Sequence, residues 1–428
     1  MKLNILHHKL IKIAAPIIIQ NLVLYMQIQV DMAMVGQANS LYLSAIANVL
    51  YPYNIVIAFL TSLSTGVTVV TSYCIGANSL KSAQRFAEVS FFFNFLFALP
   101  LFLVLYLLPE TLLTLMGTTE QINDFGTQYM EALSLSILFL GVTLSITSIL
   151  LGMGKTKHLM VASIITTATN ILFDWSLIYG HMGFPELGIQ GAGLATSIAN
   201  FSGMVYLIIA LIVSKKLLYK PSIKGILNPR WWIQMQSVKV GLPFGLEAMF
   251  WSLGQIIMVR MVNDIDEYAA GLYVLITRIQ SITFFFYLGI ARATMTLVGQ
   301  EIGAKNKAGA FYAVFLSLKY AFSICIIACI SFLLFPENIL SIFTSDKDMI
   351  TRAMPLLTIV AFTIFPVAVN VISGSGLRGM KDTKWMFYTQ SFGTVFVISV
   401  SAVMLFVFDL NLMGVVITPS YQVGLISS

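Results

Sequence analysis

Apolar stretches long enough to cross a lipid bilayer recur along the whole chain, and they limit its possible folds more than any other feature. A membrane-spanning helix needs about 20 consecutive, mostly apolar residues. Only helices and closed barrels satisfy their backbone polar groups inside a bilayer. The composition is 58% hydrophobic and 10% charged, whereas a soluble domain carries roughly 25% charged residues. The chain is therefore predicted to be an all-α polytopic membrane protein.

The apolar stretches predict eleven spanning helices and a shorter or degenerate twelfth. They lie at 11–36, 44–75, 84–108, 124–152, 158–180, 189–214, 236–262, 269–303, 310–335, 350–379, 385–408 and from 411 onward. The last starts near Leu412 and runs into the polar stretch TPSYQVGLISS, so a truncated helix is expected there.

Positive charge is distributed unevenly between the connections. Most of the 24 lysines and arginines fall in alternate connections, including the long one after residue 214. By the positive-inside rule, the N-terminus and this long connection are predicted to be cytoplasmic, in a plasma (inner) membrane protein. The excess positive charge therefore requires no nucleic-acid partner.

The two halves of the sequence repeat at one constant offset, which pairs residue n with residue n + 227, as Lys12 pairs with Lys239. The matching pairs are KIAAP (12–16) with KVGLP (239–243), IGAN (75–78) with IGAK (302–305), PETLL (109–113) with PENIL (336–340), and MGKTK (153–157) with MKDTK (380–384). Each half holds six helices, an even number, so both halves enter the membrane in the same orientation, as in some secondary transporters. We predict two parallel six-helix repeats, with lobes at 1–214 and 236–428 and a cytoplasmic linker at 215–235.

Two carboxylates lie inside predicted spans of the first half. Asp31 is in LYMQIQVDMAMVG and Asp174 is in NILFDWSLIYG, although a charged residue at a helix centre costs about 3 kcal/mol on insertion. The equivalent positions of the second half hold Met258 and Ser401, so the fold itself does not require an acid there. Asn170 precedes Asp174 by four residues and shares its helix face. These features indicate a functional role.

Further polar residues follow one face of the first and seventh helices. Gln20 and Gln27 precede Asp31 at helical spacing, and Glu247, Trp251 and Gln255 repeat the pattern in the second half. They are expected to line a water-filled substrate cavity, with Glu247 attracting cationic substrates. Hydrogen bonding between helices is the favoured alternative for the glutamines. The same alternative is favoured for Asn54, Asn94 and Gln280.

With these residues in hand, the chain resembles the multidrug and toxic compound extrusion (MATE) family of cation-coupled antiporters. The resemblance covers nearly the whole chain, including the six-plus-six arrangement and its basic central connection. It rests on Pro16 followed fifteen residues later by Asp31 in VDMAMVG, on NILFDWSLIYG, on GIQGAGLATSIAN and on GLRGMKDT (376–383). It implies a V-shaped pair of lobes that alternate between outward- and inward-facing states.

The resemblance also implies roles for individual residues. Asp31 corresponds to the coupling-ion residue, and Asn170, Asp174 and Thr196 match the residues that join it in one branch of the family. This set would bind H⁺ or Na⁺, and Pro16 marks the place where the first helix bends. Another branch uses an acid on helix 10, but here the region reads FTIFPVAVNVISG (362–374), without an acid.

The predicted function is secondary active efflux, with antiport of drugs or organic cations against H⁺ or Na⁺. The expected protein is a monomer among membrane lipids, has no cofactor, and carries small cationic amphiphilic substrates. The alternative is a flippase of lipid-linked saccharides, because Arg278, Arg292 and Lys319 lie in second-half spans and phosphate substrates favour a basic cavity. A major-facilitator transporter shares the repeat type, but GANSLKSAQR after the second helix lacks that family's Gly- and Arg-rich loop.

An enzyme is not expected, because the chain shows no nucleophile elbow, phosphate loop or metal-ligand spacing. A membrane scaffold without transport activity would leave Asp31 and Asp174 unexplained.

Overall fold

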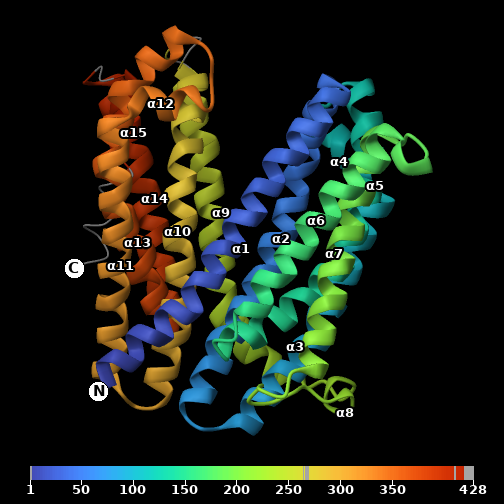
Figure 1. The fold of residues 1–428 in the computed structure, drawn as a ribbon, viewed down its shortest axis with the longest axis vertical. Helices are drawn as coiled ribbons and strands as arrows, with labels where there is room; N and C mark the ends of the chain where they lie inside the picture. Colours follow the sequence, from blue (N-terminus) through green and yellow to red (C-terminus); the bar gives the residue numbers. More distant parts are fainter. Residues whose placement is uncertain (1, 264, 266–268, 409–410, 419–428) are drawn as a thin grey trace. The chain divides into compact units, whose positions relative to one another are not determined.

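A computed structural model describes residues 2–263, 265, 269–408 and 411–418. Helices make up nearly all of this part of the chain, and no strand occurs in it. Within the same residues, eleven helices are long and apolar enough to cross a membrane (Figure 1). The predicted all-α membrane architecture is therefore confirmed.

The first repeat contains six long helices joined by short connections. They are α1 (Lys2–Ala38), α2 (Ser40–Gly76), α3 (Leu80–Leu107), α5 (Glu120–Gly152), α6 (Lys157–Tyr179) and α7 (Gly188–Val213). The connections hold the short helices α4 (Pro109–Leu115), η1 (His181–Gly183) and α8 (Ile223–Ile226).

The second repeat has the same order of elements. Its helices are α9 (Trp231–Asn263), α10 (Ala269–Gly303), α11 (Lys307–Leu334), α12 (Pro336–Ser341), α13 (Lys347–Gly379), α14 (Thr383–Phe406) and α15 (Asn411–Ile417). The part of the predicted twelfth helix after residue 418 lies outside the described residues.

The helices extend further than the apolar pattern predicts. α1 begins at Lys2, before the predicted residue 11, and α9 begins at Trp231, before the predicted residue 236. Apolar character ends at the headgroup region, whereas a helix continues until a cap or turn stops it. Asn39, for example, caps α2 because its Oδ1 accepts a hydrogen bond of 2.9 Å from the Leu41 amide. α4 and α12, each with proline at its first position, were not predicted as helices.

The structure confirms the repeat and its predicted offset. α5 and α13 begin at equivalent residues, Glu120 and Lys347, and they also end at equivalent glycines. Asn78 and Lys305, another equivalent pair, share a left-handed backbone conformation with φ of 56° and 58°. Gly154 and Lys381 repeat the match with φ of 69° and 68°. The two halves therefore repeat down to individual turns.

The chain forms two compact units whose limits fall inside helices. One unit spans Ile19 to Gly245, and the other combines the residues up to Ile18 with those from Leu246 onward. The two breaks, after Ile18 and after Gly245, lie at equivalent positions of the repeat. The first helix of each repeat, α1 or α9, is thus divided: its beginning belongs to one unit and its remainder to the other.

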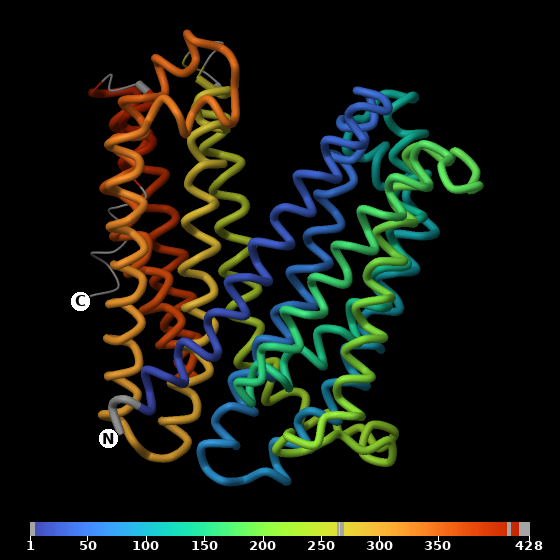
Figure 2. Tube along the Cα trace, in the orientation of Figure 1, coloured from blue at the N-terminus to red at the C-terminus, as the bar shows by residue number. Residues whose placement is uncertain are grey.

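The beginning of α1 is held by α10 and α11 in its own unit (Figure 2). His7 lies between two phenols of α11, with Nε2 3.0 Å from the Tyr312 hydroxyl and Nδ1 3.3 Å from the Tyr320 hydroxyl. Further along α1, Ile18 lies against Gly289, where an added Cβ would lie 3.0 Å from the Ile18 amide nitrogen. This contact leaves no room for a larger residue at Gly289.

The equivalent contact in the other unit joins the beginning of α9 to α2. A Cβ added at Gly245 would lie 2.7 Å from the Ser62 Cβ. Ser62 and Gly289 are equivalent positions of the repeat, as are Ile18 and Gly245. The same close approach therefore occurs in both units. The glycine lies on α10 in the contact with α1, but on α9 in the contact with α2.

The connection between α7 and α9 is attached to α3 through a buried carboxylate. Glu88 accepts hydrogen bonds from the Ser222 amide at 2.9 Å, the Ser222 hydroxyl at 2.7 Å and the Gln84 amide at 2.9 Å. Arg85 donates to the carbonyl oxygens of Gly225 and Asn228. These bonds order a segment that the sequence presents only as a basic linker.

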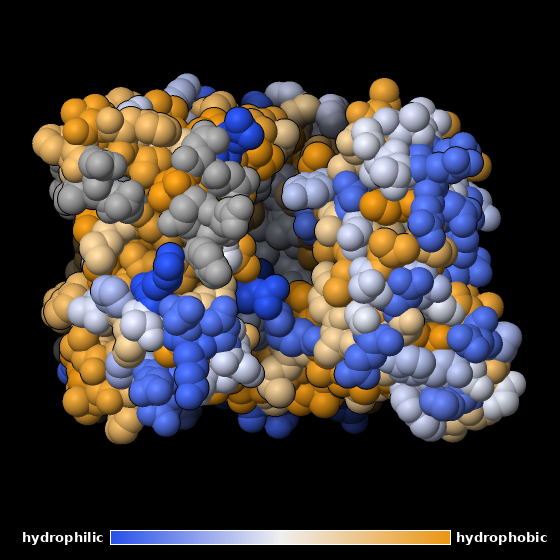
Figure 3. Space-filling view, turned by 90° about the horizontal axis from the view of Figure 1, so that it is seen from above, coloured by the Kyte–Doolittle hydropathy of each residue, from blue (hydrophilic) through white to orange (hydrophobic). Residues whose placement is uncertain are grey.

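Polar and apolar residues separate along the units as expected for spanning helices. In each unit taken by itself, the face seen in Figure 3 carries groups of hydrophilic residues among apolar ones. Large apolar side chains are exposed along the helices, including Phe311 and Phe315, which are 70% and 67% exposed. Such surfaces suit contact with lipid.

Candidate functional site

Three predicted polar residues of the first repeat meet in one buried place. Asn170 and Asp174 lie one turn apart on α6 and have no solvent exposure. The Asp31 carboxyl of α1 lies close enough to interact with both side chains. Among the described residues, neither oxygen of Asp174 and neither side-chain amide atom of Asn170 forms a well-aligned hydrogen bond. The structure thus brings Asp31, Asn170 and Asp174 together as a buried polar cluster.

No positive charge balances these carboxylates within the described part of the chain. Neither Asp31 nor Asp174 forms an ion pair with a described lysine, arginine or histidine. Burying a charge without a partner is costly, and two nearby carboxylates also repel each other. The arrangement can lower both costs by taking up a small cation or a proton.

A cavity of about 200 Å³ opens beside Asp31. Its polar lining comes from Asp31, Asn54 of α2 and Tyr129 of α5, and its other walls are apolar. Asn54, for which the sequence favours a role in helix packing, lines this cavity. No pattern in the sequence points to Tyr129, because a lone tyrosine in an apolar span has no distinctive spacing. The cavity gives the carboxylate a space that a small ligand can enter.

Thr196 and Gln27 belong to the same unit but make other contacts. The Thr196 hydroxyl donates to the Ala192 carbonyl of its own helix at 3.1 Å. Gln27 accepts a bond of 2.9 Å from the Thr167 hydroxyl, which joins α1 to α6 as expected for a helix-packing glutamine. Gln20 buries its side-chain oxygen without a hydrogen-bond partner among the residues described.

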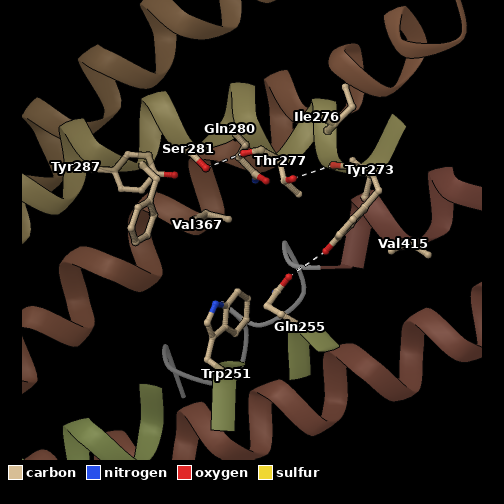
Figure 4. Close-up of a pocket in the computed structure, with 12 residues that line it drawn as sticks. Trp251, Gln255, Tyr273, Ile276, Thr277, Gln280, Ser281, Tyr287, Val367 and Val415 are labelled. Atoms are coloured by element: carbon tan, nitrogen blue, oxygen red, sulfur yellow. Dashed lines mark hydrogen bonds between the residues drawn. The ribbon is translucent and has the colours of Figure 1, made fainter. Parts of the chain in front are cut away.

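The other unit contains a larger cavity, of about 370 Å³ (Figure 4). Trp251 and Gln255 of α9 lie on one side, and Tyr273, Gln280 and other residues of α10 lie opposite. The Tyr273 hydroxyl donates to Gln255 Oε1 at 3.1 Å. The described lining has aromatic, hydroxyl and amide groups and no charged side chain. Such a surface suits an amphiphilic molecule with an aromatic or cationic part.

Glu247 forms an ion pair instead of lining this cavity. Its Oε1 accepts a hydrogen bond of 2.6 Å from Nη2 of Arg378, in the last turn of α13. The two side chains are 15% and 13% exposed, respectively. No pattern in the sequence pairs these residues, which are 131 positions apart. The predicted attraction of Glu247 for cationic substrates must therefore compete with its bond to Arg378.

Pro16, the predicted hinge, is buried inside α1 three residues before the unit limit at Ile19. α1 continues through it as one helix. A proline inside a helix removes one backbone hydrogen bond and favours bending. Its equivalent, Pro243, lies inside α9 at the corresponding distance from Leu246. α1 and α9, the two helices that contribute to both units, therefore each contain a proline that favours bending close to the unit limit.

Comparison with known proteins gives consistent matches. The family model MatE matches residues 16–176 and 243–403, two segments that lie at equivalent positions of the repeat. "Uncharacterized transporter YisQ" of Bacillus subtilis is 26% identical over 335 residues, which cover 78% of this chain and 73% of the relative. "Probable multidrug resistance protein NorM" of Thermotoga maritima is 26% identical over 380 residues, which cover 88% and 80%.

The fold also matches solved structures. The structure of a MOP superfamily transporter from Pyrococcus furiosus matches with a TM-score of 0.91 and 18% identity, over 99% of this chain and 93% of that one. At this level of identity, the likeness describes the fold alone.

Proposed function

The chain belongs to the MatE family of membrane transporters, and on that premise we propose that it exports drugs or organic cations in exchange for H⁺ or Na⁺. The observation that carries this proposal is the buried cluster of Asp31, Asn170 and Asp174 without a basic partner among the described residues. A family of drug transporters needs a group that senses the driving ion, and this cluster supplies one.

Binding of the coupling ion would neutralise the cluster. Carboxylates in a poorly solvated place favour the uncharged form, and a proton on either one removes the repulsion between them. Na⁺ is the other candidate, because the cluster offers carboxylate and amide oxygens, the ligands that hard cations prefer. Thr196 would join only after its hydroxyl turns away from the Ala192 carbonyl.

α1 would transmit this event, because it carries both Asp31 and Pro16 and contributes to both compact units. Loss of charge at Asp31 would favour a bent α1, which displaces the substrate, and release of the ion would restore the straight helix. Ion and substrate must favour different conformations by a few kcal/mol, because a ligand with equal affinity for both shifts neither.

The cavity beside Trp251 and Gln255 is proposed to receive the substrate. Aromatic rings attract cations, at about 0.5 to 2 kcal/mol per contact, and the amide and hydroxyl groups orient polar parts. Small cationic amphiphiles meet both conditions. Gln20, Gln27 and Glu247 remain predicted contributors to substrate passage.

The flippase alternative receives less support from the second repeat. Its phosphate substrates need a basic cavity, whereas the described lining of the 370 Å³ cavity holds no basic residue. Arg278 and Lys319 are exposed, and Arg292 is half-buried. We also propose that the protein is a monomeric transporter without enzymatic activity, in the plasma (inner) membrane, with its N-terminus in the cytoplasm.

Efflux from proteoliposomes tests this function. The purified protein is reconstituted, a fluorescent organic cation is loaded, and a Na⁺ gradient and a pH gradient are imposed separately. One of the two gradients should drive export. Asp31→Asn should abolish gradient-driven export, while binding of the same cation to the purified variant persists. Export by this variant at the wild-type rate would show that Asp31 has only a structural role.

A further inference from the structure

Lys319 is a positive charge on the outer surface of an apolar spanning helix. It lies on α11, which packs against α10 and α13. Lys319 is exposed on a face shared with Phe315 and Ile326, which are 67% and 50% exposed. Ionisable side chains on such a surface are rare because lipid cannot solvate them. Lys319 therefore needs either water or a negatively charged partner.

No partner for Lys319 is found among the described residues. Within these ranges, no carboxylate lies within ion-pair distance of its ammonium group. The Ser323 hydroxyl donates to the Lys319 backbone carbonyl at 3.0 Å, a bond that does not involve the ammonium group. The partner must therefore come from outside the described protein.

The depth of Lys319 in α11 excludes simple contact with bulk water. It follows Lys307, at the start of the helix, by twelve residues, or about 18 Å of helix rise. α11 is about 42 Å long, so about 6 Å at each end extends beyond a hydrocarbon core of about 30 Å. A lysine side chain reaches about 6 Å toward the interface. Its ammonium group therefore stops about 6 Å short of the hydrocarbon boundary.

Two adjoining hollows with mostly apolar walls lie beside Lys319. The first, of about 370 Å³, is lined by Lys319, Phe315, Phe322 and other residues of α11. The second, of about 180 Å³, has apolar walls from the beginning of α1 and from α11. Ser323 borders both hollows. The walls that follow Lys319 along the helix are mostly apolar, as acyl chains require.

We propose that Lys319 binds the phosphate of an anionic phospholipid from the leaflet that meets the start of α11. The acyl chains of this lipid lie along the two hollows, and its headgroup is drawn inward below the hydrocarbon boundary to reach the ammonium group. Lys305, just before α11, and Lys307, its first residue, are exposed and add positive charge at headgroup level. A net negative headgroup is selected because it cancels this charge, whereas a zwitterionic headgroup does not.

Native mass spectrometry of the purified protein tests the site. The protein is equilibrated in detergent micelles with equal amounts of phosphatidylglycerol and phosphatidylcholine, and the bound lipids are counted. The wild-type protein should retain phosphatidylglycerol in preference. Lys319→Met should reduce its occupancy about fivefold, the effect of one lysine near a membrane surface. Lys319→Arg should keep it.

Lys307→Met is the matched control, because it removes an exposed lysine from the same helix at headgroup level. It should change the occupancy much less than Lys319→Met does. Equal retention of phosphatidylglycerol by the wild type and Lys319→Met would overturn the proposal. An equal loss in Lys307→Met would do so too, since it would reveal only general charge attraction. Lys319→Gln replaces the Met variant if that variant elutes as an aggregate.

Discussion

Replacing Glu247 by glutamine tests whether this carboxylate mainly stabilises the fold, through its ion pair with Arg378, or attracts cationic substrates. If its main contact is the 2.6 Å bond to Arg378, the substitution leaves a guanidinium largely buried without its negative partner. Removing one member of a buried ion pair costs about 3 to 5 kcal/mol. Arg378 has other interactions and both side chains keep some exposure, so we expect a cost of about 2 to 3 kcal/mol. In a unit of this size, that lowers Tm by about 5 to 10 °C.

The assay is thermal unfolding of purified variants in detergent, followed by cation efflux. Glu247→Gln and Arg378→Gln should each lower Tm. The double variant should recover at least half of the loss, because it leaves no unpaired charge. Glu110→Gln, an exposed carboxylate on α4, should shift Tm by no more than about 1 °C. Unchanged Tm in Glu247→Gln together with weaker efflux would refute this reasoning and favour a role in attracting substrate.

Two further substitutions test how the helices are held. Glu88→Gln should weaken the bonds to Ser222 and cost about 1 to 3 kcal/mol, so limited trypsin digestion should cut at Lys224 faster than in the wild type. An unchanged rate would contradict an ordered connection. Gly245→Ala should lower Tm, because its Cβ would lie 2.7 Å from the Ser62 Cβ and overpacking costs about 1 to 3 kcal/mol. A Tm equal to wild type would show that α2 and α9 can separate freely.

Hydrophobicity and the repeat predicted most of the fold, because the bilayer allows few alternatives. A long apolar stretch must be helical in lipid, and four matches at one offset determined which helices are equivalent. Helix ends were less predictable. The start of α1 at Lys2 and the short helices α4 and α12 depend on capping and on packing outside the apolar core, which hydrophobicity does not report.

The candidate site was predictable only where local spacing placed residues on one face. Asn170 and Asp174 share a helix face at a spacing of four, and Asp31 was unusual by itself. The bond between Glu247 and Arg378 could not be predicted, because it joins α9 to α13 across 131 positions. The position of Tyr129 in the cavity beside Asp31 likewise depends on long-range packing, because α5 packs against both α2 and α7. Long-range contacts of this kind leave no pattern in a single sequence.

The repeat also explains why the proposed ion response belongs to one half of the protein. α1 and α9 are equivalent helices, each contributes to both compact units, and both keep their proline, at Pro16 and Pro243. They differ in charge, because the position of Asp31 is taken in α9 by Met258, which is 2% exposed. The shared proline gives both helices the ability to bend, but only α1 has a carboxylate without a basic partner among the described residues, because Glu247 of α9 pairs with Arg378. The proposed coupling to an ion therefore depends on the asymmetry between Asp31 and Met258, which the symmetric scaffold alone does not supply.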